Sequence, residues 1–449
     1  MNLTYGIKDK PAFGQTVLFA LQQLLAIMAA TIAVPAIIGN GMSQTAALFG
    51  AGVGTIVYLL FTKFRSPVFL GSSFAFLGSM ATAFAGAVSM EAGYVGLIAG
   101  ALFAGLVYVV LAILVKKFGV KWIDKLMPAV VIGPTVAIIG LSLAGNAVGD
   151  LMGTSGAVAN GASTYVCMIC GLVTLAVTML CSVFGKKMLK LIPFIIGILA
   201  GYAVATVFTL IGNATGNPAL QIINFGLFAS MSWVPDFTFV TAAKGISQLD
   251  GGYIATIAVA YIPVAFVVFA EYIADHKNLS TIIDVDLLED PGLHRTLLGD
   301  GIGSFLGAVF GGCPNTTYGE SIGCVAISGN ASVITILYTA ILAMLISFFG
   351  PFATFLATIP SCVMGGVCIA LYGFIAVSGL KMIQQVDLNK NRNLFVVSII
   401  LIAGVGGMSV SFGSVTITEV ACALILGILT NVMLSKEDPN KNEPQQLIK

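Results

Sequence analysis

The sequence predicts an all-α polytopic membrane protein, and its composition and the spacing of its apolar runs are the observations that predict it. Of its 449 residues, 58% are hydrophobic and 9% are charged. Soluble proteins contain about 25% charged residues. Fourteen apolar runs approach the length that crosses a bilayer. With a net charge of +1, the chain shows no sign of a nucleic-acid partner.

The predicted spans form two sets of seven, separated by a longer and more polar connection at 213–250. The first set covers residues 16–38, 45–62, 67–86, 93–115, 127–147, 164–183 and 191–212. The second set covers residues 252–274, 296–312, 314–328, 331–350, 354–380, 393–411 and 415–434. The runs at 67–86 and 314–328 are the weakest as full spans.

The positions of the charges favour this arrangement. If the N-terminus is cytoplasmic and the chain crosses fourteen times, 19 of the 20 Lys and Arg residues fall on the cytoplasmic side, and Lys244 is the exception. An excess of Lys and Arg marks cytoplasmic loops. Both termini are therefore expected in the cytoplasm.

The two sets also share a pattern. Pro and Gly stand five residues apart at 128–133 and again at 360–365, and two other segments run from Pro to Gly at 67–71 and 314–319. The first two segments lie in the fifth and twelfth spans and the other two in the third and tenth, which are corresponding positions in the two sets of seven. Because seven is odd, two such sets must have opposite orientations. The chain is therefore expected to be an inverted repeat, whose paired broken helices mark a substrate site.

The stretch 314–323 is the focus of this prediction. Pro314 lacks a backbone donor, two β-branched threonines follow, and Gly319 is flexible. We expect an extended piece through Tyr318 and then a half-length helix that starts near Glu320. Such backbone at membrane depth must be buried in protein or line a wet cavity. The alternative is a re-entrant loop with a structural role only.

Few acidic residues lie inside the spans. Glu271 and Asp275 are four residues apart, which places them on one helical face. Together with Glu320 they are candidates for a substrate pathway or a proton relay. Asp275 also fits a solvated helix end near the cytoplasm. Glu419 fits a solvated helix start, where the helix dipole favours an acid.

The sequence contains no pattern that predicts an enzyme, a metal site or a cofactor. It has no Walker-type motif and no evident set of nucleophile and base. Cys167 and Cys170 form a C-x-x-C inside a predicted span, but no second pair completes a zinc site, so we interpret them as core residues. His294 lies in a charged loop that we interpret as a cap and gating contact.

Four features together resemble the nucleobase–ascorbate transporter (nucleobase:cation symporter) family, with its bacterial uracil permeases the most similar branch. They are PNTTYGESIG at 314–323, LGSSFAF at 70–76, DLLEDPGLHR at 286–295, and Glu271 in the eighth span. The resemblance covers nearly the whole chain. It implies a homodimeric secondary transporter of the bacterial cytoplasmic membrane.

The resemblance also implies a domain plan. Residues 14–116 and 251–350 would form a core domain, and residues 117–212 and 351–435 a gate domain. An extracellular connection would cover 213–250, and a cytoplasmic tail 436–449. Short antiparallel strands in the third and tenth spans would meet at mid-membrane.

In the same way, the resemblance implies the site. The carboxylates of Glu271 and Glu320 would bind the pyrimidine, and the backbone amides of Phe74 and Gly319 would contact it. Tyr372 matches a supporting tyrosine. The chemistry of uracil agrees, because its two N–H groups need acceptors and its two carbonyls need donors. The flat ring could rest against Phe74 or Tyr318.

Two departures from the family pattern concern coupling. Asp275 stands where the uracil permeases have a histidine, and Gln22-Gln23 stands where many members have Gln-His. Two close acids tend to share a proton. We therefore expect a carboxylate, with Glu271 as first candidate and Asp275 or Glu320 beside it, to carry the coupled proton. His276 faces another side of the helix and is expected to be dispensable.

The function that follows is uracil import by proton symport with alternating access. The sequence leaves open a xanthine or other purine symporter and a sodium-coupled nucleobase carrier. An anion transporter of similar architecture fits less well, because such proteins tend to lack paired acids at the site.

Overall fold

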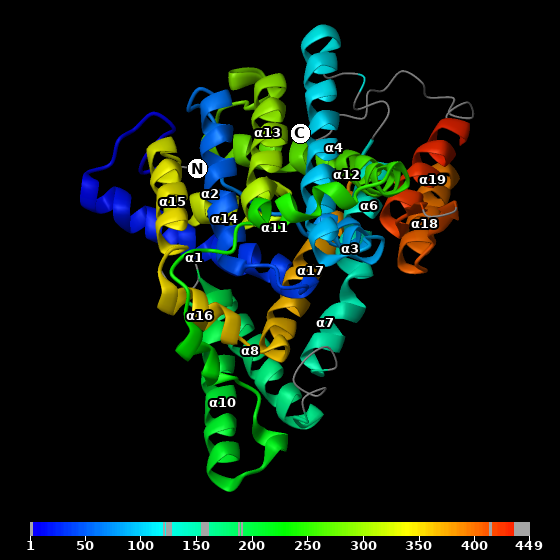
Figure 1. The fold of residues 1–449 in the computed structure, drawn as a ribbon. Coiled ribbons are helices and arrows are strands. Elements are labelled where there is room, and N and C mark those ends of the chain that lie inside the picture. The colour runs from blue at the N-terminus through cyan, green and yellow to red at the C-terminus, as the bar shows by residue number, and fades with distance from the viewer. Residues whose placement is uncertain are drawn as a thin grey trace.

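The structure is a computed structural model that describes residues 3–119, 122, 128–153, 161–186, 189, 192–412 and 415–434. Within these ranges the chain is mostly helical (Figure 1). Eight helices there are long and apolar enough to cross a membrane, or nine if a pair bent by 83° is one span. The membrane class is therefore confirmed, whereas the count of fourteen spans stays a prediction. The predicted tail at 436–449 lies outside the described residues.

The elements follow the predicted order closely. The first half contains α1 (Phe13–Ile38), α2 (Gln44–Phe61), β1 (Leu70–Ser72), η1 (Phe74–Phe76), α3 (Leu77–Ala85), α4 (Met90–Phe118), α6 (Ala129–Ser142), α7 (Ala144–Leu151), α8 (Thr164–Phe184) and α10 (Pro193–Thr215). The connection contains η3 (Pro218–Leu220), η4 (Phe225–Ser230), α11 (Thr238–Gly245) and η5 (Ile246–Gln248). The second half contains α12 (Gly251–Ile283), η6 (Leu288–Gly292), α13 (Leu293–Gly311), β2 (Asn315–Thr317), α14 (Gly319–Ser328), α15 (Val333–Ile346), α16 (Gly350–Thr358), α17 (Ser361–Ile383), α18 (Asn391–Val405), β3 (Val410–Phe412), β4 (Val415–Ile417) and α19 (Glu419–Leu434).

The broken stretch has the predicted form. Asn315–Thr317 is extended, Tyr318 is still in an extended conformation, and a helix of 10 residues begins at Gly319. Strand β2 pairs antiparallel with β1, with Leu70 opposite Thr317 and Ser72 opposite Asn315. The expected strand pair between the two halves of the chain is therefore present.

Helix α13 is the closest neighbour of this strand pair among the long helices of the second half. It packs against α2 and α4. A methyl group on Gly303 would lie 2.6 Å from the carbonyl oxygen of Gly54, so the two backbones touch. Small residues permit such close approach between helices in a membrane, where dispersion and packing hold them together.

The helix contacts fall into two sets. Helices α1, α2, α3 and α4 pack with α11, α12, α13 and α15, whereas α6, α7, α8 and α10 pack with each other and with α17, α18 and α19. These sets resemble the expected core and gate domains, but α12 and α1 also contact the second set. The exact domain boundaries stay a prediction.

Two predicted spans differ from the structure. The run at 354–380 is interrupted, because α16 ends at Thr358 and α17 begins at Ser361 with Pro360 as its N-cap. Proline cannot donate a backbone hydrogen bond inside a helix, so the chain restarts there. The end of the run at 393–411 and the start of the run at 415–434 are not helical, because they form a hairpin of β3 and β4.

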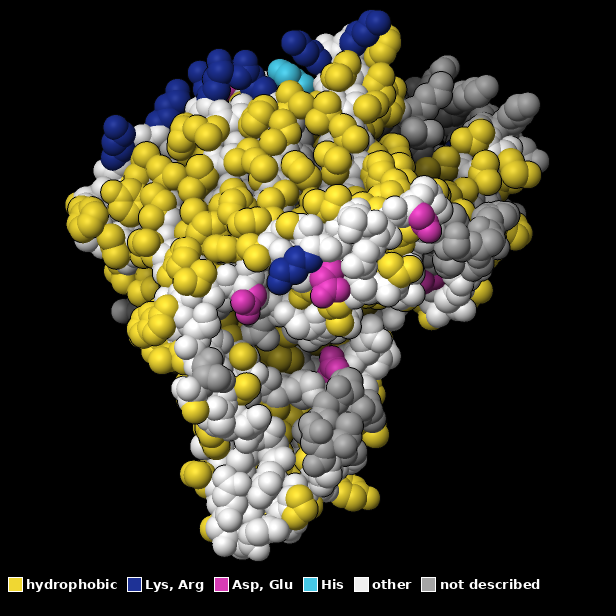
Figure 2. Space-filling model, in the orientation of Figure 1, with side chains coloured by type: hydrophobic (Ala, Val, Ile, Leu, Met, Phe, Trp, Pro, Cys, Tyr) yellow, Lys and Arg dark blue, Asp and Glu magenta, His cyan; other side chains and the backbone are white. Residues whose placement is uncertain are grey.

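Basic residues gather at one end of the molecule. Figure 2 shows Lys and Arg side chains along the upper edge and an apolar belt below it. Helix α4 reaches this end with Lys116 and Lys117 in its last turn (Figure 1). Several lysines of the charge argument lie outside the described residues, namely Lys121, Lys125, Lys187, Lys190, Lys436, Lys441 and Lys449.

Candidate substrate and proton site

The strand pair is held by side chains from neighbouring helices. The hydroxyl of Thr55 in α2 accepts from the backbone N–H of Leu70 at 2.9 Å. The amide of Asn315 donates to the carbonyl of Gly50 at 3.1 Å. The N–H of Ser73 donates to the carbonyl of Pro314 at 2.9 Å and extends the pairing by one bond. Backbone groups that would be costly at membrane depth are therefore satisfied within the protein.

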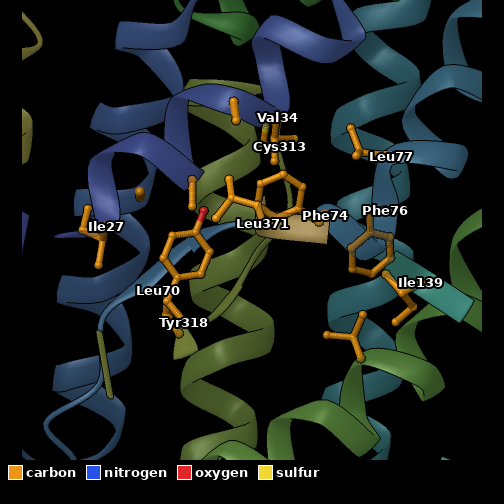
Figure 3. Packing of buried hydrophobic residues seen from close by; sticks show 14 of the residues in the cluster. Ile27, Val34, Leu70, Phe74, Phe76, Leu77, Ile139, Cys313, Tyr318 and Leu371 are labelled. Carbon is orange, nitrogen blue, oxygen red and sulfur yellow. The ribbon is translucent and has the colours of Figure 1, made fainter. Parts of the chain in front are cut away.

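Tyr318 closes the strand pair rather than facing open space. Its hydroxyl donates to the carbonyl of Ser72 at 2.8 Å, and its side chain is 4% exposed. A methyl group on Gly71 would lie 2.3 Å from the Tyr318 ring, so the ring covers this glycine. Figure 3 shows Tyr318 among the buried side chains near Leu70. The predicted stacking of a flat ligand on Tyr318 stays a prediction, and the structure places the ring in the core.

The start of α14 leaves backbone accessible. Gly319 is exposed although residues 311–318 are buried, and no heavy atom would lie within 4 Å of a methyl group there. The N-cap residue Tyr318 makes no side-chain capping hydrogen bond. The first N–H groups of a helix lack partners within it and favour electronegative atoms. This helix start can therefore donate hydrogen bonds to a ligand carbonyl.

Three carboxyl groups lie near this helix start. Glu271 interacts electrostatically with Asp275 and with Glu320. Each of the three is partly buried. The hydroxyl of Thr317 donates to Oδ2 of Asp275 at 2.6 Å and ties β2 to α12. The structure thus brings together all three predicted acids, and Asp275 is held in the site rather than at a solvated helix end.

Phe74 lies in η1, in the first half of the chain, and borders a cavity whose lining does not include Glu271, Asp275 or Glu320. Its ring meets that of Tyr372 edge-on, with centroids 5.6 Å apart. The cavity has a volume of about 580 Å³ and lies between α1, α3, α6 and the start of α19. Glu419 lies in the same lining, so this acid faces a cavity. Cavities of this size suit small molecules, which commonly need 300–1,000 Å³.

Two further buried residues have surroundings that the sequence did not predict. Gln23 is 3% exposed, and its amide donates to the carbonyl of Ser321 at 3.3 Å and to the Ser321 hydroxyl. It therefore ties α1 to the first turn of α14. Asp300 in α13 is fully buried and belongs to no predicted site. The signal for it was present, because a lone acid between Gly299 and Gly301 in an apolar run is rare.

Comparison with known proteins agrees with these features. Residues 14–412 match a family described as a permease family. The chain is 38% identical to the uracil permease of Bacillus caldolyticus over 433 residues, covering 95% of this chain and 94% of that protein. It is 37% identical to the uracil permease of Bacillus subtilis, covering 100% and 99% of the two chains. It is 36% identical to the Escherichia coli K12 uracil permease, covering 94% and 92%.

Solved structures share the fold at low identity. The transmembrane domain of the cyanobacterial bicarbonate transporter BicA matches with a TM-score of 0.64 at 15% identity, covering 95% of this chain and 99% of that one. SLC26A9 matches with a TM-score of 0.66 at 12% identity, covering 94% and 64%. At such identities the likeness concerns the fold alone, whereas the sequence matches decide the family. The chain belongs to the nucleobase–ascorbate transporter family.

Proposed function

We propose that the protein imports uracil across the bacterial plasma membrane by proton symport, with alternating access to the site. The observation that carries this proposal is the convergence of Glu271, Asp275 and Glu320 on the open backbone at Gly319. The relatives named uracil permeases support the choice of base.

The site has the polarity that uracil requires. Uracil presents two N–H donors and two carbonyl acceptors around a flat ring, so it needs acceptors and donors in one plane. The carboxylates of Glu271 and Glu320 serve as acceptors, and the N–H groups at the start of α14 serve as donors. Phe74 offers an aromatic face beside the cavity. Tyr372 supports Phe74 through their edge-on contact.

The membrane arrangement is part of the same proposal. Fourteen spans in two inverted repeats would make the antiparallel pair of β1 and β2 the meeting point of equivalent spans, as their register favours. Spans 1–4 and 8–11 would move as a core against a gate of the remaining spans, in a homodimer. The basic end of the molecule would face the cytoplasm with both termini.

Uracil is expected to compete best for uptake. Purified protein in liposomes should take up labelled uracil, and unlabelled uracil should block this uptake far better than xanthine, hypoxanthine or uric acid. The reason is that each N–H of a bound pyrimidine pairs with one acid, and a purine presents a different donor pattern. Stronger competition by xanthine than by uracil would move the assignment to the purine carriers.

Coupling is expected to depend on Asp275. An inward pH gradient should drive uracil accumulation, and a sodium gradient alone should not. Asp275→Asn should weaken accumulation more than binding, because it keeps the acceptor for Thr317 but cannot release a proton. His276→Gln tests the prediction that this side chain is dispensable, because the structure buries the ring and bonds it to Tyr58. Accumulation driven by sodium with no response to pH would make the acid pair a cation site.

A further inference from the structure

The first described residues pack back onto the connection between α14 and α15. The N–H groups of Thr4 and Tyr5 donate to the carbonyl of Gly329 at 2.8 and 3.2 Å. The carbonyl of Tyr5 in turn accepts from the N–H of Ala331 at 2.9 Å, and the pairing is a parallel β-bridge. In Figure 1 the blue segment before α1 lies beside the start of α15. We call residues 3–9 the strap.

Two more bonds join the strap to the start of α15. The carbonyl of Ile7 accepts from the N–H of Val333 at 3.1 Å. The carbonyl of Asp9 accepts from the hydroxyl of Ser332 at 2.6 Å. Ser332 and Val333 are 1% and 2% exposed. A buried donor that loses its acceptor carries the cost of its desolvation, so these two donors favour the attached strap.

The strap thereby holds the C-terminal end of α14. Gly329 is the C-cap of this helix, and its own N–H donates to the carbonyl of Val325 at 3.0 Å. Its φ of 66° is one that glycine adopts without strain. Because the carbonyl of the same residue accepts two bonds from the strap, the strap and the last turn of α14 move together. The first turn, at Gly319, is about 15 Å away along the helix axis.

Helix α14 has few other restraints. It contains 10 residues, and an isolated helix shorter than about 12–15 residues is only marginally stable. It packs mainly against α1 and α12. Gln23 of α1 bonds Ser321 in the first turn, whereas Ile327 in the last turn is 51% exposed. Gln23 therefore restrains the start of α14, and the strap restrains its end.

The strap is anchored on α1 as well. The Tyr5 hydroxyl donates to Oε1 of Gln15 at 2.8 Å, and the Tyr5 ring meets that of Phe19 edge-on, with centroids 6.0 Å apart. The N–H of Gly6 donates to Oδ2 of Asp9 at 2.7 Å and closes a turn within the strap. Helices α1 and α15 also pack against each other. The strap therefore joins elements of one contact set, so it can stay attached while the two sets move.

We propose that the strap is a positioning element of the transporter, which holds the last turn of α14 so that Gly319 and Glu320 in its first turn keep their place beside strand β2. The inference rests on the proposed function only for the identity of the ligand. A helix released at one end samples other positions. The apparent affinity then falls with the fraction of molecules that keep the competent one.

The test is the double variant Ser332→Ala and Val333→Pro in the full-length protein. It removes two donors to the strap and leaves α15 intact, because Val333 is the first residue of that helix, where proline is favoured. Ser332 has a ψ of 122°, which suits the residue before a proline, and its side chain makes no capping bond. Hydrogen exchange of the α14 amides, followed by mass spectrometry, should become about three- to tenfold faster. The dissociation constant for uracil, measured by titration calorimetry, should rise by a similar factor.

Val333→Ala is the matched control. It shortens the same buried side chain but keeps the N–H that donates to Ile7. Hydrogen exchange in α14 and uracil affinity should stay within about twofold of wild type. Exchange in α8, which belongs to the other contact set, should be unchanged in every variant. If the double variant and Val333→Ala behave alike in both measurements, the strap has no positioning role.

A disulfide between the strap and α14 supplies the reverse test. A Cβ on Gly329 would lie 3.9 Å from the Cβ of Thr4, within the roughly 3.5–4.5 Å that a disulfide spans. Thr4→Cys and Gly329→Cys are added to the double variant, and the same sample is measured oxidised and then reduced. Oxidation should return hydrogen exchange in α14 and the uracil dissociation constant to within about twofold of wild type, and reduction should reverse both. In an otherwise wild-type chain the oxidised pair should still take up uracil, because the strap stays attached during transport.

Three results would overturn the proposal. The first is wild-type hydrogen exchange in α14, or wild-type uracil affinity, in the double variant. The second is failure of the disulfide to restore them, and the third is loss of uptake by the oxidised pair in the wild-type chain, which would make the strap a moving gate. If the double variant does not fold, Ser332→Ala alone should speed exchange in α14 at least twofold, and unchanged exchange would refute the strap. A wild-type protein that does not bind uracil refutes the proposed function instead, and hydrogen exchange in α14 still tests the strap.

Discussion

Glu320→Gln is expected to weaken uracil binding by about 30- to 1,000-fold and to abolish uptake, while the protein stays folded and inserted. Removing one charged acceptor from a desolvated hydrogen bond costs about 2–4 kcal/mol, and each 1.4 kcal/mol is a factor of ten. Glu271→Gln is expected to act in the same way, because the two acids interact across the start of α14. Binding by thermal shift and uptake into liposomes measure the two effects separately.

Glu289→Gln is the matched control for these variants. This substitution makes the same chemical change, from a carboxylate to an amide, on an exposed side chain of η6. It should bind uracil as wild type does. Near-normal binding by purified Glu320→Gln protein would remove Glu320 from the substrate site.

Gly71→Ala is expected to damage both stability and transport. The added methyl group would lie 2.3 Å from two ring carbons of Tyr318 and 2.8 Å from its hydroxyl. The ring cannot yield easily, because it is buried and bonded to Ser72. Overpacking of this kind costs about 1–3 kcal/mol. A displaced Tyr318 also moves the start of α14, so uptake should fall more than tenfold.

Gly323→Ala isolates the steric effect. Gly323 lies in α14, and no heavy atom is within 4 Å of the position that its methyl group would take. This variant should keep the thermal unfolding midpoint and the uptake rate of wild type. If Gly71→Ala behaved like Gly323→Ala in both measurements, the covering role of Tyr318 would be wrong.

Local chemistry predicted the strand and half-helix at the site. Pro314 and the following threonines disfavour helix, and Gly319 with Glu320 suits a helix start, so residues 314–323 specify their own conformation. The partner strand was predicted by the resemblance. No local feature of the sequence predicts that Leu70 pairs with Thr317, because that contact depends on how α2 and α13 pack.

The ends of several spans were predicted wrongly, because they were predicted from hydrophobicity alone. Val410–Phe412 and Val415–Ile417 are as apolar as the helices beside them, yet they form a hairpin. The signal was the pair Gly406-Gly407 after α18, since glycine ends helices. The role of Gln23 could not be predicted from position, because its partner Ser321 is 298 residues away.

The pairing of β1 with β2 has a consequence for biosynthesis. Ser72 is made more than 200 residues before its partner Asn315. At roughly 5–20 residues per second, β1 waits on the order of 10–50 seconds for its partner strand. During that interval its backbone groups must be satisfied by water or by the insertion machinery, because lipid offers no hydrogen bonds. The ribosome thus completes the described helices from α1 to α13 before β2 exists, so the strand pair of the site can form only once the second half of the chain is being made.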